Sequence, residues 1–142
     1  MSGGEINPAE CIAYTVSSAV EYAGLIVTKS ASQDYMDLAS NASTQIPAGY
    51  TYTSSKNPIT GVAEANKKVG IHALIPGQIA EFVLPDTHAA VAVGDKLTFT
   101  TGGRVIKCTS GPAWVVGIAE KSVSQNTGGF IKARIMVYYL AA

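Results

Sequence analysis

Residues 94–139 read GDKLTFTTGGRVIKCTSGPAWVVGIAEKSVSQNTGGFIKARIMVYY, and this stretch decides the fold. Short apolar segments alternate here with glycine-rich turns, which is typical of antiparallel strands joined by tight connections. The turns are Gly102-Gly103, Ser110-Gly111-Pro112 and Asn126-Thr127-Gly128-Gly129. The strands predicted between them are Lys96–Thr101, Arg104–Thr109, Trp114–Lys121 and Phe130–Tyr139. The stretch therefore predicts a small β-module, and it contains no catalytic motif.

The two glycines at 102–103 predict a tight hairpin, because primed turns need positive φ and glycine adopts it without steric cost. Counting outward from a two-residue turn pairs Thr101 with Arg104 and Phe99 with Ile106. The second pair places an aromatic ring opposite a β-branched side chain, which is favourable across strands.

The last predicted strand alternates with a period of two residues. Lys132 and Arg134 fall on one side, with Phe130, Met136 and Tyr138. The other side carries apolar residues: Ile131, Ala133, Ile135, Val137 and Tyr139. This pattern indicates a strand with one buried face and one face whose centre is exposed to solvent.

The composition favours a chain with much of its surface covered. At 142 residues the chain fits a single domain with a real core. Charged residues make up 14% and the net charge is zero, whereas soluble domains carry about 25% charged residues. With a mean hydropathy of +0.21, this predicts an oligomer or a component of a larger assembly.

The same numbers disfavour some partners. Binding to nucleic acid needs a basic stripe, and Lys67-Lys68 is the only adjacent basic pair. No run approaches the roughly 20 apolar residues of a membrane helix, and the first five residues lack the pattern of a signal peptide. We therefore expect no membrane contact and synthesis in the cytoplasm.

The rest of the chain extends the all-β prediction. Residues 1–19 are expected to form an N-terminal arm, and residues 20–142 a single β-rich domain with a strand-turn core at about 69–140. A long loop is predicted over residues 39–66, and one helical turn over His88–Val93. About eight strands result, which suits a small antiparallel barrel or sandwich. The further strands are expected at Val20–Thr28, Tyr35–Leu38, Tyr50–Thr53, Val69–Ile75 and Ile79–Leu84.

No constellation of residues predicts chemistry. His72 and His88 lack further ligands at metal-binding spacing, and no phosphate-binding glycine loop or serine elbow occurs. We therefore expect no enzyme, no metal and no cofactor. Cys11 and Cys108 are predicted to be free, buried thiols.

Three aromatic residues stand near predicted strand ends: Trp114, Tyr138 and Tyr139. Such residues serve as core or subunit-interface anchors, and they can also stack on sugars or bases. We favour the first of these roles.

With these segments in place, the C-terminal half of the chain resembles the capsid decoration proteins of head-tailed double-stranded DNA viruses, also called cement or head-stabilising proteins. In that family a G-D-x-apolar entry, a glycine hairpin and a strand with the pattern apolar-apolar-G-apolar-A recur in this order. The resemblance spans residues 70–140. It is carried by Pro76–Phe82, Val93–Leu97, Gly102–Val105, Trp114–Glu120 and Ile131–Leu140.

The resemblance implies a β-barrel-like virion protein on the outer surface of an icosahedral capsid. Such a protein forms a homotrimer and stabilises the shell by bridging subunits of the major capsid protein. The residues we expect at the interfaces are Ile6, Pro8, Trp114, Tyr138 and Tyr139.

Two alternatives remain open. One is a tail or baseplate β-module that binds host-surface glycans, which an exposed Trp114 or Tyr52 lining a groove would favour. The other is a small hydrolase that uses His88.

Overall fold

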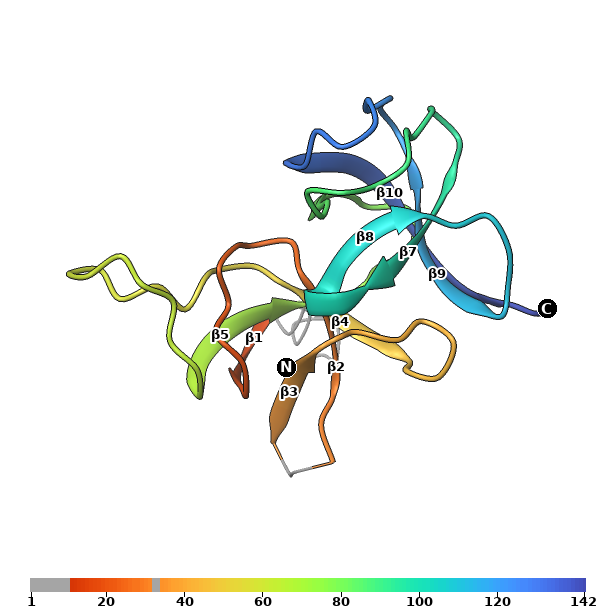
Figure 1. The fold of residues 1–142 in the computed structure, drawn as a ribbon. Coiled ribbons are helices and arrows are strands. Elements are labelled where there is room, and N and C mark those ends of the chain that lie inside the picture. The colour runs from red at the N-terminus through yellow and green to blue at the C-terminus, as the bar shows by residue number, and fades with distance from the viewer. Residues whose placement is uncertain (1–10, 32–33) are drawn as a thin grey trace, which may run out of the picture.

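The computed structural model describes residues 11–31 and 34–142, and within them the chain is built from β-strands. The all-β prediction is confirmed. Figure 1 shows two packed parts, a barrel made by the first half of the chain and a sheet made by the second half. The described residues include no helix long and apolar enough to cross a bilayer.

The first half forms a closed five-stranded barrel in the order β1-β3-β2-β4-β5. Its strands are β1 (Cys11–Val16), β2 (Ile26–Lys29), β3 (Tyr35–Leu38), β4 (Pro47–Thr51) and β5 (Lys67–His72). β1 closes the ring by pairing antiparallel with β5 and parallel with β3. The parallel pair departs from the purely antiparallel barrel that we predicted.

The second half forms an antiparallel five-stranded sheet in the order β6-β10-β9-β7-β8. Its strands are β6 (Ile79–Val83), β7 (Lys96–Thr100), β8 (Arg104–Lys107), β9 (Ala113–Ala119) and β10 (Phe130–Leu140). The predicted strands over residues 96–139 are all present, with ends that differ by one or two residues.

The hairpin between β7 and β8 corrects the predicted register. Thr100 pairs with Arg104, and Phe99 pairs with Val105 instead of Ile106. The connection is a short turn of three residues, Thr101–Gly103, rather than two. A three-residue loop with a left-handed residue shifts the pairing by one position. Phe99 and Val105 are both buried, so the aromatic and β-branched pair survives with a different partner.

A β-bulge in β10 corrects the predicted alternation. Lys132 and Arg134 are exposed and Ile135 is buried, as predicted. Between Ile135 and Tyr138 the pairing with β9 gains one residue on β10. A bulge of this kind reverses the faces of the residues that follow. Tyr139 therefore lies on the exposed face, where we had placed it on the buried one.

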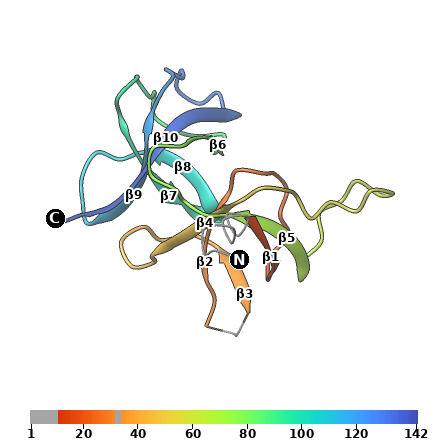
Figure 2. The same cartoon turned by 180° about the vertical axis from the view of Figure 1, so that it is seen from behind.

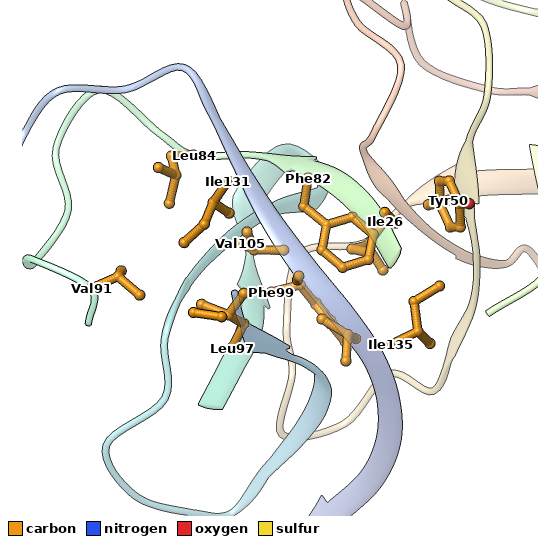
Figure 3. Close-up of a cluster of buried hydrophobic side chains, with 14 of the residues drawn as sticks. Ile26, Tyr50, Phe82, Leu84, Val91, Leu97, Phe99, Val105, Ile131 and Ile135 are labelled. Atoms are coloured by element: carbon orange, nitrogen blue, oxygen red, sulfur yellow. The ribbon is translucent and has the colours of Figure 1, made fainter. Parts of the chain in front are cut away.

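The main hydrophobic core joins the barrel to the sheet (Figure 3). Ile26 and Tyr50 from the barrel pack with Phe82 of β6, and the Tyr50 and Phe82 rings meet edge to face at 5.6 Å between centroids. β2 is buried on both faces, because Ile26 belongs to this shared core while the next residue, Val27, belongs to the core inside the barrel.

Several boundaries differ from the sequence prediction. Residues from Cys11 onward, assigned above to the arm, form barrel strand β1, and the preceding ten residues lie outside the described part of the chain. The segment 88–93 forms no helical turn and instead contributes one bridge, between Val91 and Val123. The predicted loop 39–66 contains β4 and a bridge between Lys56 and Ala63.

Candidate interaction surfaces

The most exposed large apolar side chain, that of Ile59, lies on a hairpin that projects from the barrel between β4 and β5 (Figure 1). Ile59 is 92% exposed and Val62 is 62% exposed. The Asn57 side chain fixes the turn by accepting hydrogen bonds from the backbone N–H groups of Ile59, at 2.8 Å, and Thr60, at 3.2 Å. The Lys56–Ala63 bridge closes the base of the hairpin. The hairpin therefore presents an apolar tip on an ordered support.

A groove of about 460 Å³ lies between the barrel and the sheet. Pockets of roughly 300–1,000 Å³ accommodate small ligands. The barrel contributes Ala23, Gly24, Tyr50, Thr51 and Tyr52 to its lining, and the sheet contributes Ile79, Ala80, Glu81, Phe130 and Lys132. Tyr50 and Thr51 belong to β4, and Ile79, Ala80 and Glu81 belong to β6, so the groove lies where the two parts pack together; Figure 2 labels both strands.

Two aromatic rings stand exposed in this groove. Tyr52 is 59% exposed and Phe130 is 52% exposed. Each ring is supported from behind: Tyr52 lies against the His72 ring at 5.8 Å between centroids, and Phe130 meets Tyr22 edge-on at 6.2 Å. The rings are therefore held in place while their outer faces remain accessible.

The groove also carries one charge of each sign. Glu81 and Lys132 are directly opposite each other on β6 and β10, and both are exposed. Two further cations lie close by, but Lys56 and Arg104 are placed over the Tyr22 ring, at 5.2 and 5.6 Å from its centroid. The lining itself has no net charge.

The predicted interface residues that the structure describes gather at one end of β9 and β10. Tyr139 is 46% exposed and contacts the half-buried Trp114, with ring centroids 5.4 Å apart. Tyr138 points the other way, toward the small core cluster around Cys108 and Val115. Ile6 and Pro8 lie outside the described residues.

His88 is a structural residue of the loops that flank β10. Its buried Nε2 accepts hydrogen bonds from the backbone N–H groups of Thr127 and Gly128, both at 3.2 Å. Nδ1 lies 2.8 Å from the Ala89 carbonyl oxygen. Both ring nitrogens of His88 therefore lie against backbone groups of these loops.

His72 is likewise enclosed. It stacks on Tyr50 at 5.1 Å between centroids, and its Nδ1 lies 2.7 Å from the Ala73 carbonyl oxygen. Within the described residues no group of three or more histidine, cysteine or acidic side chains is placed to hold a metal ion.

The cysteines differ from each other. Both are free; Cys108 is buried as predicted, but Cys11 is exposed on β1, where we had predicted a buried thiol. β1 lies at the ring closure of the barrel, and Cys11 is on its outer surface at the end of the pairing with β5.

Sequence reasoning missed the hairpin tip and Phe130 as surface features. The signal for the tip was present, since Asn57-Pro58-Ile59-Thr60-Gly61 is a turn sequence with an apolar residue at its centre. Tyr52 was named only as a test of the glycan alternative, and the structure places it in a groove. Trp114 and Tyr139 were expected at an interface, and the structure places their rings in contact with each other.

No protein-family model matches this chain, and no curated protein sequence matches it. Among solved structures, the chain is similar to the head fiber gp8.5 N base of bacteriophage phi29, with a TM-score of 0.56 and 16% identity. The match covers 93% of this chain and 98% of that one. At this identity the likeness concerns the fold, and it extends over both the barrel and the sheet. The chain therefore has the fold of a phage head-fiber base.

Proposed function

We propose that this chain is a structural protein of the virion of a head-tailed double-stranded DNA virus, bound to the outer surface of its icosahedral capsid. The observation that carries the proposal is the shared fold with a phage head-fiber base over nearly the full length of both chains. The strand-and-turn pattern of residues 70–140, which resembles the capsid decoration proteins, also supports it.

The surface of the chain supports a role in binding proteins. Ile59, Val62 and Tyr139 expose large apolar areas, and the overall charge is low. Protein interfaces are centred on such apolar and aromatic residues, with few charges at their core.

The mechanism we propose is bridging. Three copies assemble as a homotrimer, and each trimer contacts several subunits of the major capsid protein, which stabilises the shell against the pressure of packaged DNA. Linked binding surfaces make attachment tight even where each contact is weak. The chain is made in the host cytoplasm and binds the finished shell.

We assign the contacts as follows. Trp114, Tyr138 and Tyr139 form the candidate surface at the end of β9 and β10. The segment that precedes β1, with Ile6 and Pro8, serves as an arm that contacts the shell. To these we add Ile59 at the tip of the projecting hairpin, whose rigid turn can enter a depression on a neighbouring subunit.

Co-sedimentation with purified, undecorated capsid shells tests the proposal. We expect the wild-type chain to saturate a fixed number of sites and to show the mass of a trimer in solution or on the shell. Ile59→Ser should weaken binding, whereas Val93→Ser, a change at an exposed aliphatic residue of the sheet half, should not. Failure of the wild-type chain to co-sediment at saturating concentration would overturn the proposal.

A further inference from the structure

We propose that the groove between the barrel and the sheet is a binding site for a neutral oligosaccharide. The inference rests on the groove itself and does not depend on attachment to a capsid. It gives a location to the sugar-binding alternative, whose requirement was an exposed aromatic ring that lines a groove. Tyr52 meets this requirement.

The chemistry of the lining matches a sugar. One face of a pyranose ring carries C–H groups with a slight positive charge, and these pack against the negative face of an aromatic ring. Tyr52 of the barrel half and Phe130 of the sheet both line the groove with exposed rings that offer such faces. Sugar hydroxyl groups also need hydrogen-bonding partners at the edges of the ring.

Glu81 and Lys132 supply these partners. Neither side chain makes a hydrogen bond or ion pair with another described residue. The carboxylate can therefore accept hydrogen bonds from sugar hydroxyl groups, and the ammonium can donate to them. A few polar groups set among apolar ones are what a small-ligand site requires for orientation. Because the two charges cancel, the lining favours a neutral saccharide over an acidic one.

An extended peptide fits the groove less well, because the open edge of β6 is already covered. At that edge, the Val83 N–H donates to the Gly24 carbonyl oxygen at 3.3 Å. Gly24 also lies close to Glu81, because a Cβ added to Gly24 would lie 2.5 Å from the Glu81 carbonyl oxygen. A peptide that adds to a sheet needs several successive free backbone groups. Here the backbone of Gly24 already lies against Glu81 and Val83, so a peptide cannot pair with the backbone groups at these two residues.

The rings that line the groove are also held in position before any ligand binds. Tyr52 rests on His72, which stacks on the buried Tyr50, and Phe130 rests on Tyr22. A rigid aromatic surface loses little conformational entropy when a ligand packs on it, so more of the contact energy remains as affinity.

The test is a titration of the ¹⁵N-labelled full chain followed by NMR, with maltotriose, cellotriose and N,N′-diacetylchitobiose as neutral probes. We expect at least one probe to cause saturable shifts at the amides of Tyr52, Ile79 and Lys132. Tyr52→Ala should lower the affinity about tenfold or more, as loss of a stacking ring does at other sites. Tyr52→Phe keeps the ring and should retain binding, and Tyr139→Ala is the matched control at an exposed tyrosine outside the groove.

Two other probes separate the competing occupants. Sialyllactose, an acidic sugar, should bind more weakly than the neutral probes. A peptide with the sequence of residues 1–10 tests a peptide occupant. The proposal is overturned if no neutral probe causes saturable shifts, if the shifts persist unchanged in Tyr52→Ala, or if only the peptide binds the groove.

Discussion

The barrel of β1–β5 and the sheet of β6–β10 contain the same number of strands but are built in different ways. In the sheet, β7 pairs with β8 and β9 pairs with β10, each with its neighbour in sequence, and β7 also pairs with β9. In the barrel, β1 pairs with β3 and with β5, so the ring closes between residues far apart in the chain. Hairpins such as β7–β8 make most of the sheet predictable from sequence, although β6 also pairs with the distant β10; the closure of the barrel depends entirely on β1 meeting distant segments.

The two halves nevertheless share their interior. The largest core cluster combines Ile26 and Tyr50 of the barrel with residues of the sheet, and the barrel core in turn includes Val83 of β6. Removing apolar surface from water stabilises both halves through the same contacts. The difference in construction therefore does not make two independent folding units.

The largest effect is expected for Phe82→Ala. Phe82 is fully buried at the junction of the two halves, and truncation of a buried phenylalanine to alanine lowers the free energy of unfolding by about 3–5 kcal/mol. Urea unfolding followed by Trp114 fluorescence reports on the sheet, and hydrogen exchange at β2 reports on the barrel. The urea midpoint of the fluorescence transition should fall, and hydrogen exchange at β2 should become faster in the same variant.

Phe130→Ala is the matched control, because this ring is half exposed, and its loss should cost less than about 1 kcal/mol. If Phe82→Ala moved the fluorescence transition and left exchange at β2 unchanged, the two halves would be separate folding units and the shared core would have no energetic role.

The next effect compares two adjacent glycines of the hairpin between β7 and β8. Gly102 and Gly103 both have positive φ, at +76° and +75°. A Cβ on Gly102 meets open space, but a Cβ on Gly103 would lie 2.4 Å from the Ile26 carbonyl oxygen of the barrel. Gly102→Ala should cost about 1–2 kcal/mol for the left-handed backbone, and Gly103→Ala about 1–3 kcal/mol more for the clash.

Thermal unfolding of the two glycine variants measures this difference. Equal losses of stability in the two variants would show that the hairpin does not press on the barrel, and that the cost at both positions is local to the turn.

A smaller and more local effect is expected for His88→Ala. The change leaves the backbone N–H groups of Thr127 and Gly128 without their shared acceptor, and an unsatisfied buried donor costs about 1–3 kcal/mol. Hydrogen exchange should accelerate at these two amides while β2 of the barrel stays protected. The control is Gln125→Ala at an exposed position of the same loop. Protection at Thr127 and Gly128 equal to that of the wild type would contradict the assigned role.

The smallest effect concerns pH. Asp95 accepts a hydrogen bond from the Ala92 N–H at 2.8 Å and lies 3.4 Å from the Lys107 ammonium. The backbone hydrogen bond, more than the ion pair, lowers the pKa of Asp95 below its ordinary value. A lowered folded-state pKa gives stability that is present above the unfolded pKa of about 3.9 and is lost as pH falls through the folded one.

Asp95→Asn should therefore be less stable than the wild type at neutral pH, and the gap should close below about pH 4. Because Asp95 is solvated, the gap will be small. NMR titration of the Asp95 carboxylate measures the pKa directly, and an unshifted or raised value would contradict the prediction.

The sequence allowed the strands of the sheet to be predicted but not their details. The segments over residues 96–139 were recognisable because glycine turns separate apolar runs. The hairpin register was wrong by one residue, because Thr101 belongs to the turn. The bulge in β10 was also missed, since no residue between Ile135 and Tyr138 is of a type that marks a bulge. The bulge also explains why Tyr139, predicted on the buried face, lies on the exposed face.

The barrel and the groove were less predictable for a related reason. Cys11–Val16 is a weak strand signal by itself, and it becomes a strand because β3 and β5 flank it on both sides. Tyr52 and Phe130 are far apart in sequence, and nothing local to either residue indicates that they line the same groove. Distances between such residues depend on how the barrel packs on the sheet.

Local sequence patterns establish that this chain is built from β-strands and that residues 94–139 form antiparallel strands separated by glycine turns. Its low charge also suits a partly covered surface. These properties follow from local backbone preferences and composition, which a single segment expresses alone. The tertiary structure alone decided the closed barrel, the register of the hairpin and the groove with its exposed rings. Each of these requires segments distant in sequence to meet, and the burial of shared apolar side chains such as Phe82 and Ile26 fixes where they do.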